Sequence, residues 1–405
     1  MKPYRWGALR SSWLFLIVVL TAPALLAGDF DTVVPSKNPL AKRAFDHFYN
    51  MDYDRSVREF EQLTREFPEN PIANNYLLSA VMFKEMYRIG ALDSESYAND
   101  SFLDLKAKRA LDPEVTKRVD ELLERSERLC DVRLKKNPDD IDALYARGVA
   151  RGMRSTYMGM GQRAWLSAVR SALAARRDHE RVLQLEPGFV DAKMSIGIHN
   201  YIIGSLNFFY RSMIALTGVT GNKQKGLEYL REVSAANGVA SMDARIALAL
   251  FLRREQKYPE ALKIVKSMLD QYPKNYLAAI EYANLQNAAG LGPDAITTYR
   301  RILENYKEGK YPSAEPQAAA YGLGVTLRGQ RRFDEAAEAF AMVEGFPQAE
   351  KRQLLRSTLA AGEMYDSARK RELAVEKYKE VLQADASSPE GQLARKHLGK
   401  PFHYE

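Results

Sequence analysis

Histidine, the side chain that most often carries out acid–base or metal chemistry, is rare in this sequence. Its five histidines are His47, His179, His199, His397 and His403. No two of them are four residues apart, none lies in an H-E-x-x-H frame, and no carboxylate cluster accompanies them at ligand spacing. A bound zinc or iron ion needs several histidine, cysteine or carboxylate ligands around it. The sequence therefore predicts no metal site.

Motifs for nucleotide binding and nucleophilic catalysis are also missing. Residues 218–226, GVTGNKQKG, contain glycine and lysine as phosphate-binding loops do, but they lack the glycine-lysine-serine/threonine ending and no strand precedes them. We interpret them as a turn between helices. No G-x-S-x-G elbow occurs, and the single cysteine, Cys130, is predicted to be a buried, inert thiol. We therefore expect no enzymatic activity, no cofactor and no small-molecule substrate.

Composition and charge narrow the class of protein further. The chain has 405 residues, of which 46% are hydrophobic and 27% charged, as in ordinary folded proteins. Lys2, Arg5 and Arg10 precede residue 28 and no acidic residue does, which leaves 56 of the 59 basic residues against all 52 acidic ones. Because the basic and acidic residues are nearly equal in number, the charge gives no reason to expect a nucleic-acid partner. A single cysteine excludes an internal disulfide.

The first 27 residues have the pattern of an export signal. Three basic residues are followed by apolar runs at 13–20 and 22–26 and by small residues up to Gly28. We predict a cleavable signal peptide, cut after Ala27, and a periplasmic or cell-envelope location, with secretion as a further possibility. An uncleaved anchor is the alternative, since the run is near the lower length limit for a bilayer span. Asp29 stands where a lipoprotein would need its acylated cysteine.

The rest of the chain contains a helical repeat of about 34 residues. A small residue recurs with a large residue four positions later and an apolar residue seven positions later, which places all three on one stripe of a helix. The sets are Ala261/Val265/Met268, Ala295/Tyr299/Ile302, Ala336/Phe340/Val343 and Ala374/Tyr378/Val381. The helices upstream have a small residue midway, at Ala249, Ala283, Gly324 and Gly362. We expect these small residues to let the second helix of each pair approach closely.

These residues resemble the tetratricopeptide repeat (TPR), a helix–turn–helix unit. The resemblance covers 241–388, returns at 38–71 through Tyr53, Phe60 and Pro68, and is degenerate between them; the consensus tryptophan of the first helix is missing throughout. No run of alternating apolar and polar residues bounded by turn signals predicts a strand. We therefore predict an all-α fold, an α-solenoid of about eight TPR-like helix pairs with a C-terminal capping helix.

This repeat pattern divides the chain into five parts. They are a signal peptide at 1–27, an N-terminal linker at 28–37, a divergent TPR-like helical region at 38–240, a TPR array at 241–388, and a capping helix and tail at 389–405. The expected helix pairs are 38–68, 71–136 with a loop insertion near 90–113, 139–186, 188–238, 241–272, 275–306, 316–345 and 350–386. A last helix at 389–398 should cover the apolar end of the array.

The central region contains an apolar run at 196–216 that is nearly long enough to span a membrane. His199, Asn200, Asn207 and Arg211 interrupt it. An arginine at the centre of a bilayer costs about 2.5–3.5 kcal/mol on insertion scales. We interpret the run as one long core helix, and keep interfacial membrane contact as an alternative.

The stretch 148–226 has a residue pattern that differs from the 34-residue repeat. It includes Gly152, Arg154, Tyr157, Trp165, Pro187, Asp191, Gly197, Asn200, Tyr201 and Gly226. This stretch resembles the divergent TPR proteins related to the eukaryotic tetratricopeptide-repeat protein 39 family and their exported bacterial relatives. The resemblance implies a helical-repeat fold and no particular activity.

In a TPR array the first helices of the pairs line a concave groove. Mapping the groove positions of the repeat onto this sequence gives eight candidate partner-binding residues: Arg253, Asn284, Asn287, Tyr321, Arg328, Arg356, Glu363 and Asp366. Tyrosine and arginine dominate binding energies at interfaces, and asparagine can hydrogen-bond a peptide backbone. The lysine/asparagine clamp for C-terminal carboxylates is missing, since Asp243, Leu277 and Ala318 occupy its position. A solvated face without a partner is the alternative interpretation.

We therefore predict an exported TPR scaffold or adaptor that binds a protein or extended peptide segment in its groove and has no catalysis of its own. The first alternative is a membrane- or lipid-associated envelope factor that uses the apolar helix 196–216, so peripheral membrane contact stays open. The second alternative is an envelope enzyme with a solenoid body, for which the sequence nominates no catalytic carboxylate.

Overall fold

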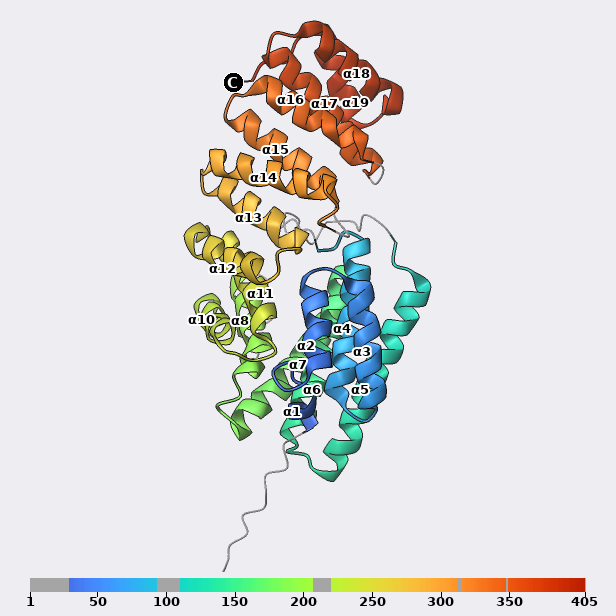
Figure 1. Ribbon diagram of the computed structural model, residues 1–405, viewed down its shortest axis with the longest axis vertical. Coiled ribbons are helices and arrows are strands. Elements are labelled where there is room, and N and C mark those ends of the chain that lie inside the picture. Colours follow the sequence, from blue (N-terminus) through green and yellow to red (C-terminus); the bar gives the residue numbers. More distant parts are fainter. Residues whose placement is uncertain (1–28, 93–109, 207–219, 312–314, 347–348, 405) are drawn as a thin grey trace, which may run out of the picture.

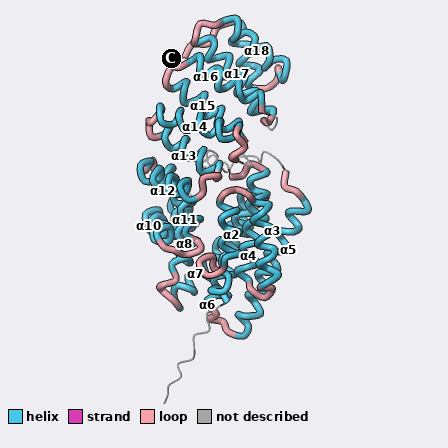
Figure 2. Tube along the Cα trace, viewed as in Figure 1, coloured by secondary structure: helices cyan, strands magenta, loops and turns pink. Residues whose placement is uncertain are grey.

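The computed structural model describes residues 29–92, 110–206, 220–311, 315–346 and 349–404. These residues form eighteen α-helices with short 3-10 and π segments, and no strand occurs among them (Figures 1 and 2). The predicted all-α class is confirmed. The predicted signal peptide, 1–27, lies outside the described residues.

The helices form eight antiparallel pairs in chain order, followed by a last helix. The pairs are α2 (Pro39–Tyr49) with α3 (Tyr53–Glu66), α4 (Pro71–Arg88) with α5 (Pro113–Lys136), α6 (Ile141–Thr156) with α7 (Trp165–Leu185), α8 (Lys193–Ser205) with α10 (Lys223–Ala235), α11 (Ser241–Arg254) with α12 (Tyr258–Gln271), α13 (Tyr276–Ala288) with α14 (Gly292–Lys307), α15 (Pro316–Gly329) with α16 (Phe333–Ala341), and α17 (Lys351–Ser367) with α18 (Arg371–Asp385). Helix α19 (Pro389–Gly399) packs on α17 and α18 and covers the end of the array, as expected. The solenoid prediction is therefore confirmed pair by pair.

The repeated small residues lie where the two helices of a pair meet. Ala261, Ala295, Ala336 and Ala374 are fully buried. A Cβ atom added to Gly324 would lie 2.6 Å from the ring of Phe340, and one added to Gly362 would lie 2.7 Å from the ring of Tyr378. Such distances leave no room for any side chain larger than hydrogen. The glycine of the first helix therefore accommodates the aromatic residue of the second, as the spacing predicts.

The turn within a pair also repeats. In five pairs, the second residue after the first helix takes a positive φ, at Met51, Gln256, Gly290, Arg331 and Arg369. The next amide then donates to the carbonyl five residues earlier, for example from Leu291 to Gln286 at 2.9 Å and from Arg332 to Leu327 at 3.0 Å. This is the Schellman arrangement, which satisfies the last free carbonyls of a helix. One recurring backbone turn therefore sets the angle of these five pairs.

The predicted linker at 28–37 is partly helical. Helix α1 (Asp29–Val33) is short, and its last residue, Val33, is fully buried. The ring of Phe30 packs edge-on against Tyr145 with 5.6 Å between centroids, and its amide donates to Asp142. The apolar side chains of Phe30 and Val33 therefore draw this segment onto α4 and α6, and the linker assignment is corrected to this extent.

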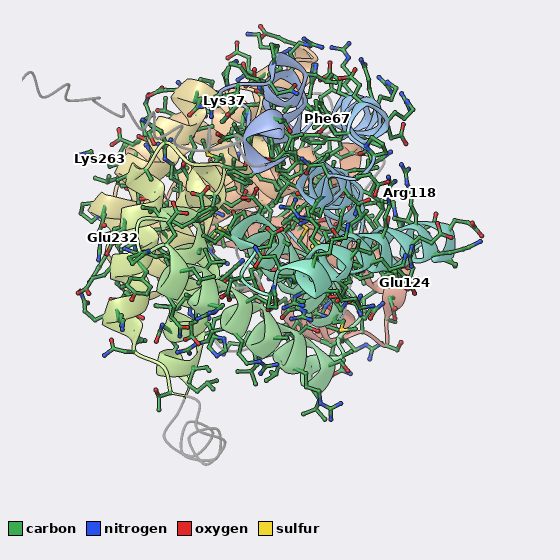
Figure 3. The ribbon with its side chains drawn as sticks, turned by 90° about the horizontal axis from the view of Figure 1, so that it is seen from below. Lys37, Phe67, Arg118, Glu124, Glu232 and Lys263 are labelled. Atoms are coloured by element: carbon green, nitrogen blue, oxygen red, sulfur yellow. The ribbon has the colours of Figure 1, made fainter. Side chains whose placement is uncertain are left out.

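The first pair closes the N-terminal part of the solenoid. Seen end-on in Figure 3, the colours run from blue α2–α4 through teal α5 and green α6–α8 to yellow α11–α12, beside the blue helices again. Asn275 Nδ2 donates to the carbonyl of Tyr49 at 2.8 Å, and the rings of Tyr49 and Tyr272 lie 5.2 Å apart. Helices α13 to α19 continue away from this ring as stacked pairs (Figure 1). We call them the C-terminal arm.

The central apolar run does not form one long helix. Helix α8 ends at Ser205 and Leu206 is extended, so the interpretation of 196–216 as a single helix is wrong at this point. A Cβ atom on Gly204 would lie 2.5 Å from the amide nitrogen of Lys223, because the start of α10 crosses here. Residues 207–216 lie outside the described part. No helix among the described residues has the length and apolar character needed to cross a membrane.

Candidate partner-binding groove

Three first helices, α13, α15 and α17, carry most of the predicted binding residues. Each begins after a turn and presents a small residue to its second helix, Ala283, Gly324 or Gly362. That contact fixes the rotation of the first helix, so the residues on its other faces point away from the pair. The positions of the predicted residues therefore follow from the same spacing that forms the pairs.

The structure brings Tyr321 of α15 and Arg356 of α17 together. The guanidinium of Arg356 lies 5.3 Å from the centre of the Tyr321 ring, and its Nη2 donates to the tyrosine hydroxyl at 3.1 Å. Arg356 is exposed and Tyr321 is half-buried, with its ring 5.3 Å from Phe340. An arginine stacked on an aromatic ring keeps donors free for a planar acceptor such as a carboxylate or peptide carbonyl.

Arg328 and Glu363 extend this contact along the same two helices. Burial raises the pKa of Glu363 to about 7, the charge of Arg328 opposes that rise, and Asp366 adds to it. His397 Nε2 of α19 lies 3.5 Å from Glu363 Oε1. Arg328 is half-exposed and makes no ion pair within the described part of the chain. This part of the groove therefore offers cationic side chains beside a carboxyl that carries little charge below pH 7.

Three further predicted residues lie on α11 and α13. Arg253 is buried and its Nη1 donates to Glu281 Oε2 at 2.7 Å, so the guanidinium joins α11 to α13. The Asn284 side chain accepts from the hydroxyl of Tyr299, while its amide nitrogen is buried without a hydrogen-bond partner in the described residues. Asn287 is exposed. The structure therefore gives Arg253 an internal role and does not join these three residues to the cluster on α15 and α17.

Asp366 binds the chain's own C-terminal segment. Its carboxylate accepts from Arg371 Nη1 at 3.0 Å, from the Tyr378 hydroxyl at 2.9 Å and from the amide of Phe402 at 2.8 Å. Arg371 also donates to the carbonyls of His397 and Leu398 at 2.8 and 2.7 Å. Asp366 is therefore a buried anchor for the tail in this structure.

The sequence did not predict which residues pair with the buried side chains of Arg253 and Asp366. Glu281 and Arg371 fall outside the groove positions of the repeat, so the consensus gives no signal for them. The tail is a separate case, since Tyr404 packs on Phe333 with 5.5 Å between ring centroids and no repeat pattern extends to residues 400–404. A buried carboxylate on a first helix needs a counter-charge, and that need is the one signal that could have indicated Arg371.

Family models for the tetratricopeptide repeat match three stretches of the chain, 219–276, 252–311 and 283–350. The matched residues begin just before α10 and end just before α17. Residues 219–350 contain tetratricopeptide repeats. The match covers the region where the aligned alanines and the Schellman turns recur most regularly.

Several solved structures are similar to this chain at low sequence identity. PilF of Pseudomonas aeruginosa is 14% identical over 64% of this chain and 97% of its own, with a TM-score of 0.39. A tetratricopeptide repeat protein from Parabacteroides merdae is 14% identical over 83% and 97%, with a TM-score of 0.32. Yeast Tom70 is 12% identical over 90% and 88%, with a TM-score of 0.34. A comparison with curated proteins found no match.

Proposed function

We propose that this protein is an exported scaffold that binds an extended protein segment along the first helices of its C-terminal arm, without catalysis of its own. The observation that carries the proposal is the contact of Arg356 with the ring of Tyr321, which joins α15 of the matched repeats to α17, the first helix of the next pair. TPR arrays are protein-interaction scaffolds, and stacked arginine and tyrosine are the residue types that contribute most at interfaces.

The closed ring is the reason to place the partner on the arm. Within the ring, Tyr49, Tyr76 and Tyr145 of the first helices α2, α4 and α6 are buried. On the arm, Arg328 is half-exposed and Arg356 is exposed, and neither makes an ion pair with another described residue. We propose a partner that supplies carboxylates or backbone carbonyls to these two guanidinium groups.

An envelope location is part of the same proposal and comes from the sequence of residues 1–28. The basic start, the apolar run and the small residues are typical of a cleaved export signal. Mass spectrometry of the N-terminus after fractionation tests it. A chain that starts at Met1 in the cytoplasmic fraction would remove the location and leave the groove proposal intact.

The groove is tested by crosslinking the chain to its partners in the cell envelope and mapping the crosslinked peptides. We expect crosslinks on α15 and α17 that are lost in the triple variant Tyr321→Ala, Arg328→Ala, Arg356→Ala. The matched control is Lys263→Ala, Arg301→Ala, Lys379→Ala, which removes three exposed cations from second helices. Both variants must keep the wild-type helical content and melting temperature. Equal capture by both would show that the partner binds elsewhere.

A further inference from the structure

The solvent face of α7 combines exposed apolar side chains with arginine. Leu166 is 80% exposed and Val169 is 50% exposed. Residues 166, 170, 173 and 177 follow one another at helical spacing, so Leu166, Arg170, Leu173 and Arg177 form one stripe along the helix. We call Leu166, Val169, Arg170, Leu173 and Arg177 the α7 face.

The opposite side of α7 is firmly fixed, so the exposure of the α7 face does not come from loose packing. Ala168, Ala175 and Val182 are buried against the neighbouring helices. Asp178 is buried and accepts from Arg147 at 2.8 Å and from Arg151 at 2.7 Å, and both arginines belong to α6. This orientation leaves Leu166 and Val169 of the α7 face in solvent, where they gain nothing unless a partner covers them, while Leu173 is half-buried.

The charge of the α7 face has one sign. From Gln162 to Arg177 the sequence contains four arginines and no Asp or Glu. Arg170 and Arg177 make no ion pair with any residue that the structure describes, whereas Arg176 of the same helix pairs with Glu180 at 2.6 Å. Since no acidic side chain of α7 neutralises them, an occupant that covers the apolar residues must itself be anionic.

A polar pocket adjoins the α7 face. It has a volume of about 580 Å³, and its lining includes the ion pair of Arg176 with Glu180 on α7, Asn200 of α8, and Lys225 and Tyr229 of α10. The Lys225 ammonium lies 5.4 Å from the centre of the Tyr229 ring and has no carboxylate partner in the described part of the chain. Arginine, lysine and amide donors that converge in a pocket of this size suit a phosphate-bearing head group.

We propose that the α7 face is a membrane-docking surface for anionic phospholipid, with Leu166 and Val169 at the acyl boundary and Arg170 and Arg177 on the phosphates. The adjoining pocket takes one head group through Lys225, the lining cation that has no carboxylate partner among the described residues. Exposed leucine and valine, with a tryptophan at the helix start and arginine as the only charge, are typical of helices that lie in a membrane interface. This surface lies on α7, separate from the run 196–216, and leaves the arm free for its protein partner.

Trp165 gives a direct readout. The full chain has three tryptophans, Trp6, Trp13 and Trp165, so Trp6→Phe with Trp13→Phe leaves Trp165 as the single reporter. In vesicles of phosphatidylcholine and phosphatidylglycerol with brominated acyl chains, we expect quenching of Trp165 that is weakened by salt. Pure phosphatidylcholine vesicles should give none. Attachment of the chain alone is not the readout, because the apolar residues before Gly28 can themselves insert.

Two sets of variants test the roles of charge and of apolar contact. Arg170→Gln and Arg177→Gln should each weaken the quenching affinity about fivefold, because a basic residue near an anionic surface contributes about 1 kcal/mol. Leu166→Ser with Val169→Ser should abolish quenching. The matched control is Lys263→Gln with Arg301→Gln, two exposed cations far along the chain, which should change nothing. Each variant must retain its melting temperature.

Three outcomes would overturn the proposal. One is the absence of Trp165 quenching in anionic vesicles. Another is equal quenching in neutral vesicles or in the Arg170→Gln, Arg177→Gln variant. The third is crosslinking of the α7 face to an acidic protein in the envelope without any quenching, which would identify a protein as its occupant.

Discussion

The hydroxyl of Tyr49 donates a hydrogen bond of 3.0 Å to Oδ1 of Asp243, across 194 residues of sequence. The first residue belongs to the first helix pair and the second to the fifth. The same junction includes the bond from the Lys274 amide to the Asn50 side chain at 3.1 Å. A linear solenoid contacts only its neighbours along the chain, so this junction makes the first five pairs one cooperative unit.

The fold should lose stability as pH rises, because the buried Asp243 carboxyl ionises less readily in the folded chain even though the Tyr49 hydrogen bond favours its ionised form. Burial raises the pKa of Asp243 to about 6, and the nearby Asp191 adds to the rise. A carboxyl whose pKa is higher in the folded than in the unfolded chain stabilises the fold below about pH 4, and this contribution is lost as pH rises through about 6. Asp243→Asn keeps an oxygen that can accept from Tyr49 and removes the ionisation.

We therefore expect Asp243→Asn to increase the free energy of unfolding at pH 8 by about 1–2 kcal/mol relative to the wild type, with little difference at pH 4. Denaturant titrations at both pH values measure it. The exposed Asp120→Asn on α5 is the control for the removal of one carboxylate from the surface. A destabilised Asp243→Asn protein at pH 8 would contradict the assignment.

Gly324 should not tolerate a methyl group. In Gly324→Ala the new Cβ would lie 2.6 Å from the Phe340 ring, so α15 and α16 must separate. We expect a loss of about 1–3 kcal/mol in unfolding free energy, as in other overpacked cores. Gly329→Ala, at the end of the same helix, meets nothing within 4 Å and should be neutral or stabilising. Partial recovery of stability in Gly324→Ala with Phe340→Leu would confirm that the clash is the cause.

The positive φ at the turns predicts opposite effects on stability for two substitutions, glycine to alanine at one turn and glutamine to glycine at another. Gly290 has φ 77° and open space around its Cβ position, so Gly290→Ala should cost about 1 kcal/mol through backbone strain alone. Gln256 takes φ 56° at the equivalent turn, and Gln256→Gly should relieve strain of similar size. Thermal unfolding of the two variants compares them. Shifts of melting temperature in the same direction would contradict the argument.

Asp366 should matter for stability before it matters for binding. Asp366→Ala leaves Arg371 and Tyr378 without their shared acceptor, and breaking a buried charge pair costs about 3–5 kcal/mol. Proteolysis should then release the segment after Gly399. The exposed Asp334→Ala removes an ion pair with Lys370 at the surface and should cost less than about 1 kcal/mol. A stable Asp366→Ala protein with an anchored tail would contradict this account.

The sequence by itself determined the architecture of the helix pairs. Ala295, Tyr299 and Ile302 are buried as their spacing predicts, and the pair boundaries agree with the structure to within a few residues. The reason is that each pair packs mainly on its neighbours in sequence, so the information is local. It also predicted the Tyr321 and Arg356 positions, since groove positions follow from the same repeat.

Only the tertiary structure decided which of these positions are free. Arg253 and Asp366 occupy groove positions of the repeat as Arg356 does, yet Glu281 of α13 neutralises Arg253 and Arg371 of α18 neutralises Asp366. The contact of Tyr49 with Asp243 depends on how each of the first five pairs is rotated relative to the pair before it. These rotations add up along the chain, so no single repeat specifies the contact. The α7 face is likewise known only once α6 fixes which side of α7 is buried.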